Sequence, residues 1–160
     1  MAKWTIGKGL DEYLAKLGDL EFMSPEIIGK ATYKGAKVVA DQIRANIQAL
    51  PTEPKGSRNR GRRDPTPEEK QGLLEGLGVS IHRVDGSFYN VKIGMDGYNS
   101  VVTDKYPHGH PNAMVARTIE SGNSFIARHP FISSAVRSTK AAAEEAMKEE
   151  VDRLIAETMK

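Results

Sequence analysis

Apolar residues recur at a helical period in two long stretches of the chain, and the first lies in its N-terminal third. Apolar or small side chains return every three to four positions from Ile28 to Leu50, where Pro51 interrupts the pattern. Ser24 can accept a backbone N–H as a helix cap, and Pro25 suits the first helical position. We therefore predict a long helix that begins at these two residues and ends at Leu50.

The second long stretch occupies the C-terminal part of the chain. Pro130 is followed by an apolar stripe from Ile132 to Met159, with Glu, Lys and Arg on the opposite face. This pattern predicts a helix that runs to the last residues.

Ahead of the first long helix, the spacing of Leu and Tyr over residues 10–17 predicts a short, separate helix that stops near Gly18.

Between the long helices the period shortens to two, which is typical of strands. Alternation over residues 79–84 and 87–95 predicts two strands, and the dipeptide of Asp85 and Gly86 between them favours a tight hairpin turn. Two strands alone are marginally stable, so the hairpin needs a helix or further strands to cover one face. A third strand is expected near residues 98–102.

Two short helices are predicted on either side of the hairpin. Thr66 and Glu69 have the spacing of a capping box, so the first helix should begin there and end near Gly76 or Gly78. The second helix is expected within residues 112–122, where the glycine at its end acts as a stop.

These elements predict one α+β domain over residues 1–160, in which a small antiparallel sheet, the hairpin plus one or two further strands, is packed by the two long helices. Hydrophobic residues make up 39% of the chain and charged residues 28%, which indicates an ordinary globular domain. The absence of cysteine excludes disulfides and thiolate chemistry. No run approaches the ~18 apolar residues of a membrane span, and the N-terminus has no apolar signal core. We therefore expect a soluble protein that is made in the cytoplasm and does not enter a membrane.

Residues 51–66 are rich in proline, glycine and positive charge and contain no large apolar side chain. Such a segment buries too little surface to offset the entropy of ordering it, so we predict a flexible basic loop. No aromatic residue is interleaved for stacking on bases. The candidates for contact with a DNA phosphate backbone, or with an acidic partner protein, are the five cations of this loop: Lys55, Arg58, Arg60, Arg62 and Arg63.

The sequence contains no pattern that singles out a catalytic, cofactor or metal site. His108 and His110 form a His-x-His pair, but they lack the third and fourth ligands that a zinc site requires at defined spacing. There is no nucleophile elbow, no phosphate-binding glycine loop and no His-Glu-x-x-His motif. We therefore predict a protein that is not an enzyme and that uses no cofactor and no metal.

Three motifs, taken with the order of the elements, resemble a known family. A leucine-containing segment, GLLEGLGVSIHRV, leads into the first strand. An aliphatic helix ends in a Glu-x-Gly-(Ser/Thr)-like turn over residues 119–124, and a Pro-Phe step followed by small residues starts the last helix. The layout of residues 24–155, and the motifs within residues 115–136, are similar to the tail-completion, or head–tail joining, proteins of long-tailed bacteriophages, a family often labelled putative minor tail component.

The resemblance implies a non-enzymatic structural protein of the virion, assembled in the host cytoplasm. Members of this family act at the neck, typically as a ring of six copies around the channel through which DNA passes. The implied partners are therefore further copies of the chain, the head connector or adaptor proteins, the tail terminator or tail tube protein, and DNA in the channel. The positions that match the family's motifs are Glu120, Gly122, Pro130 and Phe131.

A function of a different class remains open from the residues alone. The basic loop would suit a small DNA-binding protein that acts through residues 55–63 and binds without sequence preference, with an affinity that falls as salt rises.

Overall fold

The computed structural model describes residues 8–54, 61–81, 83–85 and 88–160. Its described part is an α+β fold of helices and short antiparallel strands, as the sequence predicted. In chain order the elements are α1 (Lys8–Ala49), α2 (Pro67–Gly76), β1 (Leu77–Val79), β2 (Arg83–Asp85), β3 (Phe88–Asn90), β4 (Ile93–Met95), α3 (Asn112–Ser121) and α4 (Phe131–Thr158).

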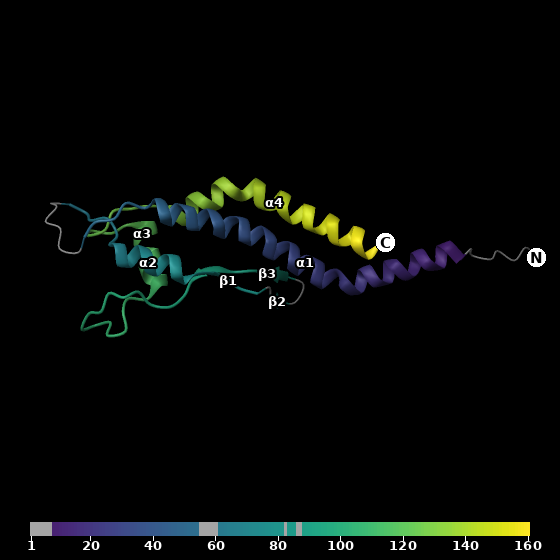
Figure 1. Ribbon diagram of the computed structural model, residues 1–160, viewed down its shortest axis with the longest axis horizontal. Helices are drawn as coiled ribbons and strands as arrows, with labels where there is room; N and C mark the ends of the chain where they lie inside the picture. The colour runs from purple at the N-terminus through teal and green to yellow at the C-terminus, as the bar shows by residue number, and fades with distance from the viewer. Residues whose placement is uncertain (1–7, 55–60, 82, 86–87) are drawn as a thin grey trace, which may run out of the picture.

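The two long helices pack against each other along the length of α4 (Figure 1). Gly35 of α1 faces Met147 of α4, and a Cβ atom added at this glycine would lie 2.6 Å from the Met147 Cγ. Glycine at this position therefore allows the two helices to approach closely. Beyond the end of α4, α1 continues alone, so the molecule is elongated (Figure 1).

The first helix differs from the sequence prediction. A short helix that stops near Gly18 and a second one capped by Ser24 were expected, but α1 is continuous and holds Pro25 in its interior. Tertiary contacts on both sides of Pro25 offset the cost of the helical hydrogen bond that the proline cannot donate. On one side the Lys16 Nζ donates hydrogen bonds to carbonyl oxygens at the end of α4, and on the other Ile27 is buried.

The predicted hairpin is present as two short ladders. β1 pairs with β4, with Leu77 opposite Met95, and β2 pairs with β3, with Asp85 opposite Phe88. Between the ladders the Ser80 N–H donates to the Lys92 carbonyl over 2.8 Å. Asp85 therefore belongs to a strand rather than to the turn, and Gly86, Ser87 and His82 lie outside the described residues.

The third strand expected near residues 98–102 does not form in the described part of the chain. Tyr98 makes one isolated bridge, to Pro111. The next residue, Asn99, satisfies the neighbouring backbone with its side chain, because its Oδ1 accepts from the N–H groups of Val101 and His110. A side-chain acceptor thus replaces the ladder that a strand would need.

The hydrophobic core lies at one end of the molecule, where α2, α3 and the start of α4 surround the last turns of α1 (Figure 1). Its centre is formed by Ile47, Leu73 and Ile119, all without solvent exposure. Toward the other end α1 and α4 pack on each other, and the short strands lie against α1. No helix in the described residues is both long enough and apolar enough to cross a membrane.

Candidate functional site

The motif residues of the α3–α4 junction meet at the N-terminus of α4. The Glu120 carboxylate, from the last turn of α3, accepts hydrogen bonds from the backbone N–H groups of Ile132 at 2.8 Å and Ser133 at 3.0 Å. These N–H groups have no partner within their own helix, and the helix dipole favours a negative charge beside them. Glu120 therefore caps a helix that begins eleven positions later in the chain.

The hydrogen bonds also change the acidity of this carboxyl group. Burial by itself would raise the pKa of Glu120, but hydrogen bonds from the Ser133 hydroxyl and from the Ile132 and Ser133 amides hold this pKa below its ordinary value. The group is therefore a carboxylate at neutral pH, and both of its oxygens are already engaged.

The other three motif residues shape the same junction. Gly122 has a φ of 70°, and a Cβ atom there would lie 2.9 Å from the Arg128 Cβ, so this turn requires glycine. Pro130 directly precedes α4, and Phe131 opens the helix with only 3% of its surface exposed. The motif thus forms a structural joint that ends one helix, starts the next and anchors both in the core.

The end of the basic loop is attached to this joint. The backbone of Arg63 exchanges hydrogen bonds with residues on either side of Ile126: its N–H donates to the Phe125 carbonyl at 2.7 Å, and its carbonyl accepts from the Ala127 N–H at 2.9 Å. Its guanidinium forms a two-pronged ion pair with Glu69, with both N–O distances at 2.8 Å. Of the five predicted contact cations, Arg63 is engaged internally and Arg62 is exposed, whereas Lys55, Arg58 and Arg60 lie outside the described residues.

Glu69 is the buried partner in that pair and also completes the predicted capping box. The Thr66 hydroxyl accepts from the Glu69 N–H, while the Glu69 carboxylate accepts from the Thr66 N–H. Burial alone would raise the pKa of Glu69, but the Arg63 guanidinium and the Thr66 amide hold it below its ordinary value. Next to this pair, the His129 Nε2 lies 2.8 Å from the Asp64 Oδ1. This contact is a second link, after that of the Arg63 backbone, between the segment before α2 and the α3–α4 junction.

His108 and His110 lie in the loop before α3. No group of three or more candidate ligands occurs among the described residues. The His110 ring instead packs edge-on against Tyr106 at 4.8 Å between ring centroids, and its Nε2 lies 3.5 Å from the Thr103 hydroxyl. These contacts order the loop locally.

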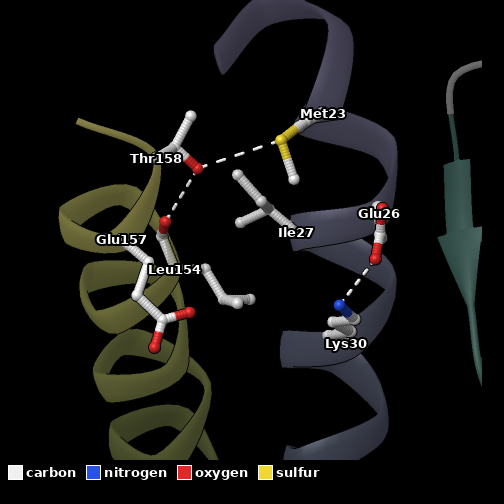
Figure 2. A pocket seen from close by; sticks show the side chains of 7 residues that line it. All are labelled: Met23, Glu26, Ile27, Lys30, Leu154, Glu157 and Thr158. Atoms are coloured by element: carbon white, nitrogen blue, oxygen red, sulfur yellow. Dashed lines mark hydrogen bonds and ion pairs between the residues drawn. The ribbon is translucent and has the colours of Figure 1, made fainter. Parts of the chain in front are cut away.

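A cleft of about 300 Å³ lies between α1 and the last turns of α4 (Figure 2). Met23, Ile27 and Leu154 supply apolar side chains, and the ion pair of Glu26 and Lys30 lines its edge, as Figure 2 shows. The sequence reasoning missed this cleft because it began the helix at Pro25. The apolar spacing from Met23 to Ile27, read through the proline, was the signal for it.

A second groove, which we call the lysine groove, runs over the surface of α1. Three lysines of α1 line it, together with Tyr33, Ile81 before β2, and Glu150 of α4. The volume of the groove is about 350 Å³. Hydrogen bonds from Arg153 and from the groove's Lys34 lower the pKa of Glu150 to about 2, so this acid is ionised in all physiological conditions. The three lysines are Lys30, Lys34 and Lys37.

The N-terminal part of α1 carries large apolar side chains that the described residues leave uncovered. We call residues 12–22 the apolar arm. Phe22 is 87% exposed, and Leu14 and Tyr13 are each about half exposed. α4 ends beside Lys16, so the part of the arm before that residue extends past the end of α4 (Figure 1). Exposed apolar side chains gathered in this way mark an interaction surface.

Comparisons with known proteins leave the chain without an assigned relative. No family model, no curated protein and no solved structure matches it. Its function must therefore be argued from the surfaces described above.

Proposed function

We propose that this chain is a non-enzymatic structural subunit of a phage virion that joins or completes the tail at the head–tail interface. The observation that carries the proposal is the apolar arm, whose large side chains are exposed at one end of an elongated molecule. A protein that works alone rarely keeps such a surface, whereas a subunit completed by its neighbours requires one.

Two further features support an assembly role. The four residues that match the motifs of phage tail-completion proteins build a rigid joint between α3 and α4, with both Glu120 oxygens bonded to α4. Their engagement in the fold suits a scaffold better than a reaction centre. In the proposed role the chain forms a ring, typically of six copies, between the head connector or adaptor proteins and the tail terminator or tail tube protein.

The experiment that tests the role is imaging of phage particles assembled without this protein. Filled heads should accumulate apart from tails, or tails should be left incomplete, because the ring that holds them together is missing. Supplying the wild-type chain in trans should restore joined particles. Normal, filled heads stably joined to tails in the absence of the chain would overturn the proposal.

A second candidate function is DNA binding through the basic loop. The observation in its favour is that Arg62 is exposed next to Arg63, whose backbone holds one end of the loop in place. Duplex DNA affinity, measured across a salt series, should fall steeply as salt rises. A variant with Lys55, Arg58, Arg60 and Arg62 changed to Gln should lose this binding, while Arg137→Gln on α4 should keep it. No binding at low salt, or binding unchanged by neutralisation, would exclude this function.

A further inference from the structure

The apolar arm and the lysine groove are complementary in charge. The arm carries the acids Glu12, Asp19 and Glu21, all exposed, and its one lysine, Lys16, is bonded to carbonyl oxygens at the end of α4. Three lysines line the groove: Lys34 is paired with Glu150 and Lys30 with Glu26, whereas no ion pair of Lys37 occurs among the described residues, so the groove keeps a net positive charge. An acidic helix that approaches this groove is therefore attracted to it, and a basic one is repelled.

The two surfaces are also complementary in apolar area. Leu14 is 53% exposed and Leu17 is 38% exposed on the arm. In and beside the groove, Ile81 is 79% exposed and Tyr33 is 44% exposed. Covering these side chains removes apolar surface from water on both sides of the contact, which is the main favourable term in association.

The arm of a given molecule cannot reach the groove of the same molecule. Both lie on the single continuous helix α1, where the arm is centred near residue 17 and the groove near residue 33. At about 1.5 Å per residue that separation is roughly 24 Å along a rigid helix. The occupant of the groove must therefore come from another molecule.

We propose that the apolar arm of one copy docks in the lysine groove of a second copy. In this contact Leu14 and Leu17 pack on Tyr33 and Ile81, and Glu21, which lies on the same face of the helix as the two leucines, pairs with Lys37. Lys37 is suited to such a pair, because no ion pair of its own occurs among the described residues.

The contact joins two different surfaces, so it propagates. A dimer held by one arm still has one arm and one groove unoccupied, and association continues until the chain of contacts closes into a ring. This closure rests on the proposed function, but the contact between arm and groove does not, and it is tested with the isolated protein.

The test is the solution mass of the full chain, measured by sedimentation at several concentrations. The wild-type mass should rise with concentration. The variant Leu14→Ser/Leu17→Ser should raise the dissociation constant at least about tenfold, because two apolar side chains leave the contact. The matched control Val136→Ser, which removes an exposed apolar side chain from α4, should associate as the wild type does.

A charge exchange separates a lost contact from a damaged fold. Glu21→Lys should weaken association, and so should Lys37→Glu, each by roughly tenfold at low salt. A chain that carries both changes should associate to within about threefold of the wild type, because attraction is restored with its signs reversed. Lys148→Glu, on an exposed part of α4, is the control for an added acid.

Each outcome decides between the alternatives. A wild-type chain that stays monomeric at all concentrations overturns the contact between arm and groove. Association that is unaffected by both the arm variants and the groove variants overturns it as well, but leaves the neck role standing on another interface. Association that follows the charge exchange, together with normal particles in the absence of the chain, supports the contact and refutes the neck role.

Discussion

At the scale of single residues, the feature that stands out is a carboxylate used as a helix cap across a turn. Glu120 belongs to α3 yet bonds the first N–H groups of α4, so one side chain sets the relative position of two helices. A catalytic acid would need a free oxygen that faces an open site. Both Glu120 oxygens accept hydrogen bonds from backbone N–H groups, so a structural role explains this residue better than a catalytic one.

The first prediction concerns this cap. Glu120→Ala should lower the free energy of unfolding by about 1 kcal/mol, the usual cost of removing a helix-capping side chain. Glu120→Gln should lose less, because its amide oxygen still accepts one N–H. Urea denaturation at pH 7 measures both. The control is Glu149→Ala on the exposed face of α4, and an equal loss in that variant would contradict the capping role.

The second prediction concerns acid. The pKa values of Glu69 and Glu120 are lowered in the folded protein, so the unfolded chain takes up protons first as pH falls. Their contribution to stability is complete above the ordinary value of 4.5 and is lost as pH falls through the lower folded values.

The free energy of unfolding, measured by urea denaturation at a series of pH values, should therefore fall as the pH is lowered from about 6 to about 3. The free energy of unfolding should depend less steeply on pH in a Glu69→Gln/Glu120→Gln variant. An identical slope in the variant would show that other carboxyl groups cause the acid sensitivity.

At the scale of elements, α1 shows how packing decides where a helix begins. Ser24 and Pro25 form a good local start signal, and Gly18 a good local stop signal. The helix nevertheless runs through all three from Lys8 to Ala49. Contacts with α4 on both sides of the proline hold the backbone helical, whereas capping preferences contribute only about 1 kcal/mol each.

The third prediction follows from the interior proline. Pro25→Ala restores an N–H to the helix and should stabilise it by about 1–3 kcal/mol, since proline is the poorest residue in a helix interior. Far-UV circular dichroism during thermal unfolding measures the effect. Pro67→Ala is the matched control, because Pro67 lies at the start of α2, where an N–H has no partner within the helix. Its melting temperature should stay the same or fall.

At the scale of the whole molecule, stability is distributed unevenly. The core cluster gathers at the α2–α3 end, whereas toward the opposite end the described residues pack mainly through α1 and α4, with the short strands against α1. The arm extends beyond both (Figure 1). Regions with few buried apolar contacts open with the lowest free energy, so the ends of this protein should differ greatly in local stability.

The fourth prediction is a gradient of amide hydrogen exchange. At low protein concentration the amides around Ile47 and Ile119, both fully buried, should exchange slowest, and those of residues 12–22 fastest. Exchange followed by mass spectrometry measures both regions. Slowing of the arm as concentration rises would support its docking on a second copy, whereas strong protection of the arm in the dilute monomer would contradict the uneven distribution.

Local patterns predicted most of the elements. The capping box of Thr66 and Glu69 is present, the short helix ends at Gly122, and the hairpin pairs as its alternation required. These features depend on neighbours a few residues apart, so the sequence contains all the information they need. The arm could not be predicted as exposed, because its Leu and Tyr spacing is the same for a buried helix and for one without a partner.

The sequence by itself determined the fold class, the long helices and the position of the α3–α4 joint, because periodicity, caps and glycine stops act through local backbone geometry. Only the tertiary structure decided that α1 continues through Pro25, that Arg63 is paired with Glu69, and that Glu120 caps α4. Each of these depends on groups brought together from distant parts of the chain. These interactions form only when the core brings distant parts of the chain together. Where they form, they stabilise the structure more than the local preferences oppose it.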